Sequence, residues 1–454
     1  MSLNFFIFFS SYFLILLSIL GYGYFLLSFE KNNKNLSNLG YVGVIGIFFL
    51  IVYSYLSNVL IPHSKIHNSF ILLFGLVNFI YFLKKYFNKS LFKKDLFFLV
   101  IVFLVLFCSI LISKNHDDFA YYHFSYTYNL TQDDFNFGIG IFNHGFRTPS
   151  SIFYLNSLFY LPYVEYYLFN FSAIFILGFS NIIILRKINN FFIIFKFKKE
   201  KISFINYLSL LIFIFINIFF YRISEHGTDR SAQILILILF VYLMNYFIKI
   251  KNNKIDLLFI YTLFGIIISL KAFYFLYFLF FIPLFFFIYN QNKNIIFSLK
   301  YFLINKYFIY FLLLISLVIF SYFANTGCLL YPVSFTCFDS VAWSISSETT
   351  KQMNNHYELW SKAGLTPLSK VSNPDEYILG FNWVSNWLDV YFFNKVSDFI
   401  FGLLFVISIL WFIFFNDKRN KNSKKKNKFI IITYLILLLI FFEWFYNHPA
   451  LRYG

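Results

Sequence analysis

The stretch DLFFLVIVFLVLFCSILIS, residues 95–113, carries a charge only at its first position. About 20 apolar residues in a helix cross the roughly 30 Å hydrocarbon core of a bilayer. Runs of about 17–25 apolar residues recur along the 454-residue chain, which is 60% hydrophobic and 13% charged. Strands of a β-barrel would be shorter and would alternate in polarity. The sequence therefore predicts an all-α polytopic transmembrane bundle.

Twelve membrane helices are expected. They lie near residues 3–29, 40–61, 69–87, 95–113, 164–186, 202–221, 231–249, 255–273, 274–290, 307–324, 397–416 and 429–446. We expect residues 1–94 to form a three-helix addition before a core of residues 95–454. The end of the chain, NHPALRYG, looks cut short.

The connecting loops fall into two alternating sets that differ in charge. One set, with its flanking residues, holds 26 of the 37 Lys and Arg but five of the 20 Asp and Glu. Cytoplasmic loops are rich in Lys and Arg, so this set is predicted to be cytoplasmic. The N-terminus and the two long loops, 114–163 and 325–396, then lie outside. The net charge of +17 is thus a topology signal in a bacterial inner-membrane protein, and no nucleic-acid partner is expected.

Several features of the outer loops have more than one interpretation. Cys328 and Cys337 share the second long loop, where a disulfide and two free thiols are both open. Residues 151–170 are amphipathic enough to lie along the membrane surface. Three tryptophans of the second loop fit either the membrane interface or stacking on a sugar ring: Trp360, Trp383 and Trp387.

The strongest local signal is HDDFAYYHF, residues 116–124, where the fourth helix leaves the membrane. Asp117 and Asp118 are adjacent carboxylates, and like charges raise one another's pKa when they are partly buried. One of them is a candidate general base, with His116 and His123 beside it. A solvated loop with a helix cap is the plainer alternative.

A second signal is the short outer turn EHGTDR, residues 225–230. Glu225, His226, Asp229 and Arg230 place four ionisable groups in six positions, more than helix capping requires. Near the outer end of the eighth helix, Lys271 interrupts an apolar stretch. It is either a functional charge or a snorkelling interfacial lysine.

The last residues of the chain add two basic groups on the outer side. His448 and Arg452 could contact an anion, since the planar guanidinium of arginine matches phosphate. No glycine-rich phosphate loop for a soluble nucleotide occurs in the chain.

This layout resembles the GT-C superfamily of polytopic glycosyltransferases that use polyprenyl-phosphate sugars. The resemblance covers residues 95–454 and rests on the acidic pair, the later acidic turn and the basic groups at outer helix ends. GCLLYP, from residue 327, and the LRYG ending also resemble uncharacterised bacterial membrane proteins placed near this superfamily. The resemblance implies that Asp117 or Asp118 acts as base or binds a metal, and that Asp229 or Glu225 is the second acid. Arg230, Lys271 and Arg452 would neutralise the lipid phosphate.

The sequence therefore predicts transfer of a sugar from a polyprenyl-phosphate donor to a cell-envelope glycan or lipid on the outer face. No cofactor is required by the residues, no metal ligands are predicted, and a divalent metal stays open because the doublet is not an acid-any-acid triplet. Two alternatives remain. An enzyme similar to O-antigen polymerases or ligases would depend on Arg147 and Arg452, whereas a transporter or flippase would carry charges near the bilayer midplane.

Overall fold

The computed structural model describes residues 4–30, 38–87, 90–112, 117–198, 204–219, 227–248, 254–365, 371–414 and 428–451. Within these ranges ten helices are long and apolar enough to cross a membrane, and Phe204–Ile218 and Asp256–Leu270 are shorter apolar helices. The same ranges contain isolated β-bridges but no sheet. The prediction of an all-α polytopic bundle is confirmed, and the chain is an integral membrane protein.

The helices that correspond to the twelve predicted runs are α1 (Phe5–Ser28), α2 (Leu39–Asn58), α3 (Lys65–Tyr86), α4 (Ser90–Ile112), α7 (Phe171–Lys198), α8 (Phe204–Phe219), α9 (Gly227–Ile248), α10 (Lys254–Leu270), η5 (Ala272–Phe280) continued by α11 (Phe281–Asn292), α13 (Lys306–Thr326), α17 (Ser397–Phe414) and α18 (Lys428–Asn447). Shorter helices and turns occupy the connections: η1 (Phe119–His123), α5 (Phe124–Gln132), η2 (Ile139–Ile141), η3 (His144–Arg147), α6 (Ser151–Ser157), η4 (Tyr166–Leu168), α12 (Ile295–Leu303), η6 (Ser334–Thr336), α14 (Ser347–Lys362), α15 (Pro374–Ile378), α16 (Val384–Trp387) and η8 (Leu388–Val396).

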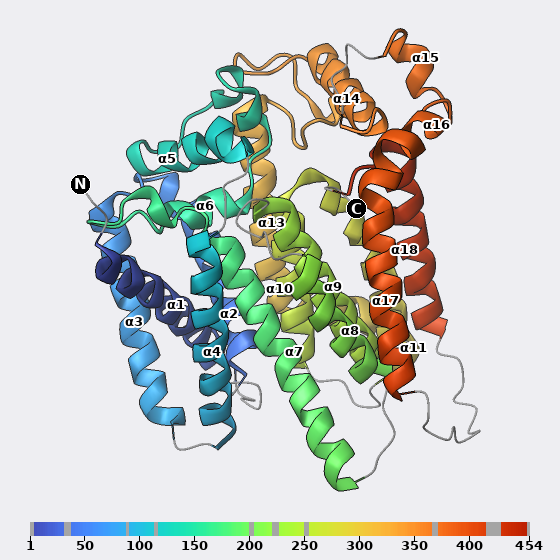
Figure 1. The fold of residues 1–454 in the computed structure, drawn as a ribbon. Helices are drawn as coiled ribbons and strands as arrows, with labels where there is room; N and C mark the ends of the chain where they lie inside the picture. The colour runs from blue at the N-terminus through green and yellow to red at the C-terminus, as the bar shows by residue number, and fades with distance from the viewer. Residues whose placement is uncertain are drawn as a thin grey trace.

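The two ends of the bundle differ in what they carry (Figure 1). The helices of the long loops, α5, α6, α14, α15 and α16, gather at one end, which we call the loop end. At the opposite end α3, α7 and α17 finish, and α4 and α18 begin. The described helix ends that flank the loops 84–94, 187–201 and 417–428 therefore lie opposite the two long loops.

Burial separates central helices from peripheral ones. The apolar windows of α7, α2 and α9 are 89%, 78% and 67% buried, whereas that of α18 is 28% buried. Peripheral helices expose large apolar side chains, for example Phe401 and Phe412 of α17. A water-soluble surface would not carry such faces, but hydrocarbon accepts them.

Glycines allow the N-terminal helices to approach one another closely. A Cβ at Gly21 of α1 would lie 1.8 Å from the carbonyl oxygen of Gly75 in α3. A Cβ at Gly46 of α2 would lie 1.9 Å from the carbonyl oxygen of Ile19 in α1. Small residues of this kind support packing between membrane helices, where van der Waals contact replaces the hydrophobic effect.

The N-terminal helices are joined to the rest of the bundle through α2. This helix packs on α1 and also on α7, α10 and α13. The division into a 1–94 addition and a 95–454 core stays a prediction.

The prediction that residues 151–170 lie along the membrane surface is wrong for its first half. Every residue from Ser151 to Leu161 is buried, because α6 inserts among α2, α5, α7 and α10. Only the following turn returns to the surface, where Tyr163 is 71% exposed.

A buried polar network fastens α6 to the start of α3. His63 is fully buried and lies between two hydroxyls, with Nδ1 2.6 Å from Ser157 Oγ and Nε2 2.9 Å from Ser57 Oγ. The Ser157 hydroxyl donates to the Tyr154 carbonyl oxygen, so it accepts from Nδ1, and a neutral imidazole satisfies both contacts. Asn68 Nδ2 closes the network by donating to the carbonyl oxygens of His63, Ser157 and Tyr160.

Acidification should weaken this network. Burial, followed by the charge of His67, lowers the pKa of His63 to about 3. Between that value and about 6.5 the unfolded chain binds a proton that the folded protein does not, so stability falls as the pH falls. From pH 7 to pH 5 we expect His63 to account for about 2 kcal/mol of lost stability.

The measurement is thermal unfolding in detergent at both pH values. A His63→Asn variant should lose less stability between pH 7 and pH 5 than the parent protein. His356→Asn, at an exposed position, is the control and should keep the parent's dependence. If the His63 variant and the parent lose equal stability between pH 7 and pH 5, His63 does not cause the pH dependence.

Candidate functional site

The acidic pair lies at the loop end, where it begins an irregular helical turn. Asp117 is exposed and Asp118 is half-buried. The turn η1 that follows them is π-helical, a geometry that is frequent at functional sites. It continues directly into α5 and carries Phe119 and His123.

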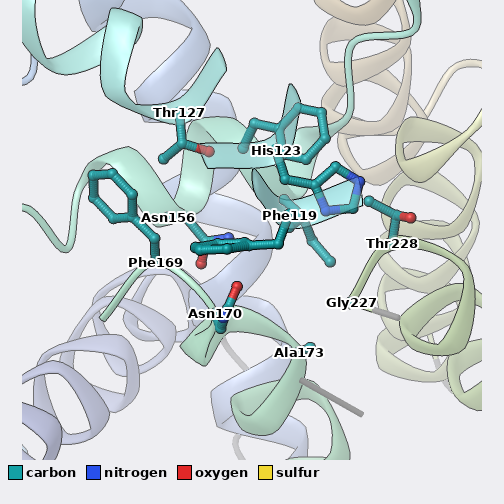
Figure 2. Close-up of a pocket in the computed structure, with 11 residues that line it drawn as sticks. Phe119, His123, Thr127, Asn156, Phe169, Asn170, Ala173, Gly227 and Thr228 are labelled. Carbon is teal, nitrogen blue, oxygen red and sulfur yellow. The ribbon is translucent and has the colours of Figure 1, made fainter. Parts of the chain in front are cut away.

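A small pocket with an interior of about 10 Å³, enough for roughly one water molecule, lies between η1 and the beginning of α9. Figure 2 shows His123 and Thr228 facing each other across it. Its lining comprises Phe119, His123, Thr127, Ile152, Phe153, Asn156, Phe169, Asn170, Ala173, Gly227 and Thr228. Asp118 directly precedes the first lining residue of η1, and Asp229 directly follows the last lining residue of α9. The two predicted acidic elements therefore border one pocket.

The lining combines aromatic surfaces with a few polar groups. Phe119, Phe153 and Phe169 supply ring faces or edges, while His123 and Thr228 supply hydrogen-bonding atoms. Such a mixture is typical of sites for small organic ligands, in which apolar walls bind and sparse polar groups orient.

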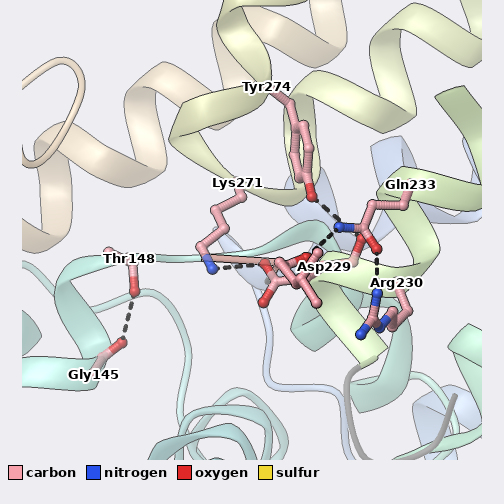
Figure 3. A network of polar contacts seen from close by, with 8 residues as sticks. Gly145, Thr148, Asp229, Arg230, Gln233, Lys271 and Tyr274 are labelled. Carbon is pink, nitrogen blue, oxygen red and sulfur yellow. Dashed lines mark hydrogen bonds and ion pairs between the residues drawn. The ribbon is translucent and has the colours of Figure 1, made fainter. Parts of the chain in front are cut away.

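Asp229 is almost completely buried and pairs with Lys271 (Figure 3). The Lys271 Nζ donates to Asp229 Oδ1 at 2.6 Å, and the side chains are 21% and 3% exposed respectively. Lys271 stands at the junction between α10 and the 3-10 helix η5. From η5, the Tyr274 hydroxyl donates to the Asp229 carbonyl oxygen at 3.3 Å. The interpretation of Lys271 as a freely snorkelling interfacial lysine is therefore wrong, because its ammonium group is paired inside the protein.

Arg230 extends the same network toward the C-terminal segment. Its Nη1 donates to Gln233 Oε1 at 2.9 Å, and Gln233 Nε2 donates to the Leu451 carbonyl oxygen at 3.2 Å. The guanidinium also lies 5.8 Å from the ring centre of Phe399. The segment after α18 thus contacts the first turns of α9 directly.

Aromatic residues of the second long loop hold this C-terminal segment in place. Trp387 Nε1 donates to the Pro449 carbonyl oxygen at 2.8 Å, and the Leu451 amide donates to the Tyr391 hydroxyl at 2.8 Å. Trp383 and Trp387 are 0% and 3% exposed. The prediction that these two tryptophans lie at the membrane interface or stack on a sugar is wrong, because they pack against each other and Phe445.

His448 lies in a positively charged environment. Burial, and then the neighbouring charges of Lys362 and Lys271, lower its pKa to about 4, so the imidazole is neutral at pH 7. Lys362 was not apparent from the sequence. Its side chain is fully buried, pairs with Glu358 at 2.6 Å and lies 5.0 Å from the ring centre of Tyr446.

The structure brings several of the predicted site residues together. Asp229 pairs with Lys271, Arg230 bonds Gln233 on the next turn, and the charge of Lys271 acts on His448. His123 lines the adjoining pocket, and Asp118 directly precedes the pocket residue Phe119. Arg147 is on the turn η3, which packs against η1 and α13; Gly145 and Thr148 of the same turn are drawn in Figure 3. Four predicted residues lie outside the described ranges: His116, Glu225, His226 and Arg452.

Two further observations concern the disulfide and metal binding. Cys328 and Cys337 form a disulfide, which decides between the two states that the sequence left open. Among the residues that the structure describes, no three His, Cys, Asp or Glu side chains gather closely enough to hold a metal ion.

The Asp229–Lys271 pair should be strongly coupled. Removing one partner leaves a buried charge uncompensated, at a cost of about 3–5 kcal/mol. We expect Asp229→Asn and Lys271→Met each to destabilise the protein, and the double variant to cost at least about 2 kcal/mol less than their sum. Denaturant unfolding of the parent, the two single variants and the double variant measures this coupling energy.

The Lys65–Glu165 pair, whose side chains are 35% and 46% exposed, is the control, and its coupling energy should be less than about 1 kcal/mol. Equal coupling in both pairs contradicts the prediction.

The comparisons with known proteins give one match. Neither the curated proteins nor the solved structures include a match to this chain. A family model described as a domain of unknown function, DUF8201, matches residues 5–454. That match spans the helical bundle, the pocket and the polar network together, so the chain belongs to the DUF8201 family.

Proposed function

We propose that this protein is a membrane glycosyltransferase of the GT-C type. It would move a sugar from a polyprenyl-phosphate donor to a cell-envelope glycan or lipid on the outer face of the bacterial inner membrane. The observation that supports the proposal is a single pocket lined by Phe119 and Thr228, which are the chain neighbours of Asp118 and Asp229.

The pocket chemistry is consistent with a sugar substrate. The proposal requires the pocket to widen around its substrate. Ring faces such as those of Phe119 and Phe169 would then pack on the apolar faces of a sugar, and His123, Asn170 and Thr228 would offer hydrogen bonds to hydroxyls. The long apolar helices would leave the polyprenyl chain in the bilayer while its phosphate stays at headgroup level.

The reaction needs a base and positive charge. An acceptor hydroxyl attacks C1 of the sugar, its proton passes to a carboxylate, and the bond from C1 to the phosphate oxygen breaks. The polyprenyl phosphate leaves with the bonding electron pair and gains negative charge. We assign the base to Asp118, because it directly precedes the pocket residue Phe119 and is half-buried, whereas Asp117 is exposed.

The other charged groups receive supporting roles in this proposal. Asp229 is committed to Lys271, so we assign it to positioning the ammonium rather than to proton transfer. Lys271 and Arg230 would stabilise the developing charge on the leaving phosphate, as preorganised cations do in shielded sites.

Replacement of the base tests the proposal. A strain that lacks the protein is complemented with each variant, and extension of its envelope glycan is measured by mass spectrometry. Asp118→Asn should lower extension by about 10²–10⁴-fold, the usual range for general-base loss, while the exposed Asp117→Asn should have a smaller effect. Asp229→Asn should also impair extension, through misplacement of Lys271.

The chain contains a matched control for this test. Asp133 and Asp134 form a second DDF sequence with Phe135, and both carboxylates are exposed. Asp133→Asn and Asp134→Asn should retain extension. If the Asp118→Asn variant, at the same protein level as the parent, extends the glycan fully, Asp118 is not the base. Lipid translocation in proteoliposomes, without any covalent change to the lipid, would instead favour the transporter alternative.

The orientation is part of the proposal and has its own test. A disulfide in the second long loop supports an oxidising, non-cytoplasmic environment for the loop end. In a protein with Cys108→Ser, Asp134→Cys should react with a membrane-impermeant maleimide in intact cells. Lys293→Cys, exposed after α11, should react only after permeabilisation. The reverse labelling pattern overturns the orientation.

A further inference from the structure

Arg147 is held on a turn that is anchored firmly to the end of α13. The Gly138 amide donates to the Ala324 carbonyl oxygen at 2.8 Å, and Asn325 Nδ2 donates to the Phe146 carbonyl oxygen at 3.0 Å. A Cβ at Gly140 would lie 2.6 Å from the Asn325 carbonyl oxygen and 3.2 Å from Arg147 Cγ. Glycine there permits the close approach, and the arginine stem has a defined place.

The guanidinium of Arg147 lacks a carboxylate partner within the described part of the chain. Its Nε donates to the Gly140 carbonyl oxygen at 3.0 Å. The five ion pairs found among the described residues all involve other side chains. A half-buried arginine that lacks an acid retains charge and donors for a ligand.

Two tyrosines from the second long loop complete the surroundings. Tyr357 of α14 lies with its hydroxyl 2.8 Å from His144 Nε2. Tyr331, inside the disulfide-closed segment, is fully buried, and no described residue accepts the proton of its hydroxyl, although Arg147 and Tyr357 lie within donating reach of the hydroxyl oxygen. Arg147 and Tyr357 both approach that hydroxyl closely enough to affect it. A buried hydroxyl whose proton has no acceptor is unfavourable, so an acceptor supplied by a ligand would stabilise it.

The electrostatic environment of this cluster is positive. Burial, and then the charges of Arg147 and His356, lower the pKa of His144. Burial raises the pKa of Tyr331, and the neighbouring Arg147 opposes that rise. No carboxylate is among the groups that shift the pKa of His144 or of Tyr331.

We propose that Arg147, His144, Tyr331 and Tyr357 form a binding site for a compact oxyanion, a phosphate or a carboxylate. The guanidinium presents donors in a fixed fork that matches such groups, and the Tyr331 hydroxyl donates a further hydrogen bond. Gly145 of the same turn packs against Tyr122 of η1, and other residues of η1 line the pocket. The oxyanion site therefore adjoins the pocket without sharing its lining residues. Its assignment to an acidic group of a substrate rests on the proposed function, but anion binding itself does not.

The test is anion binding to the full-length protein in phosphatidylcholine nanodiscs. Inorganic phosphate and glucuronate are titrated separately at constant ionic strength, and the rise in Tm reports binding to the folded state. We expect saturable binding of at least one of the two anions. Arg147→Gln should weaken it about 10–100-fold, as loss of a charged hydrogen-bond donor does, and Tyr331→Phe should weaken it about 3–10-fold.

Three comparisons keep the test decisive. Lys351→Gln, an exposed cation on α14, should bind as the parent does. Arg147→Lys keeps the positive charge but loses the forked guanidinium, so its affinity for the anion should lie between those of the parent and of Arg147→Gln. Asp118→Asn should bind normally, so loss of glycan extension and loss of anion binding can be told apart.

The source of the oxyanion is settled by a change of lipid. If phosphatidylglycerol nanodiscs abolish the response that phosphatidylcholine nanodiscs show, the site takes a lipid headgroup; if the response persists, it takes a soluble anion. Either result supports the site. The absence of saturable binding, equal weakening by Arg147→Gln and Lys351→Gln, or parent-like affinity in Arg147→Gln overturns it.

Discussion

The hydrocarbon core of a bilayer offers no partner to a backbone N–H or C=O group. Each spanning segment must therefore satisfy its own hydrogen bonds, and a helix does so residue by residue. Because of this constraint the described membrane segments are helical, and irregular backbone is found mainly at the loop end. There, water and side chains can pair with polar groups, and there the pocket and both charged clusters lie. The same hydrocarbon solvent accepts apolar side chains, which is why phenylalanines of α17 are exposed on the protein surface.

Charge inside such a bundle is stable only when it is paired. Asp229 and Lys271 come from different helices and meet at the edge of the central bundle. Their pairing orders the beginning of α9 and the junction of α10 with η5. The same first turns of α9 also contact the pocket and, through Gln233, the C-terminal segment. One ion pair thus links three elements on which the proposed chemistry depends, and rigid support of this kind is what positioned catalytic groups require.

The two long loops are folded structures rather than simple connectors. Trp387 donates to the Pro449 carbonyl oxygen and Lys362 lies over the ring of Tyr446 in α18, and both contacts tie the second loop to the bundle. The disulfide of Cys328 with Cys337 closes a segment within the loop itself. In the first loop, α6 is buried in the interior and η3 packs on α13. Both long loops therefore present their polar side chains at fixed places beside the pocket, as a site for an oriented substrate needs.

The sequence alone determined the helical class, the twelve apolar runs and the segregation of their loops into two sets, because hydrophobic length and charge are local properties. It also located the acidic elements at Asp118 and Asp229. It could not show that these elements border one pocket, that Asp229 pairs with Lys271, or that α6 is buried, since these facts depend on neighbours far apart in the chain. The roles of Tyr331, Tyr357 and Lys362 were invisible for the same reason. A lone tyrosine or lysine carries no local signature, and only the packing of the second loop against the bundle gave each of them its surroundings.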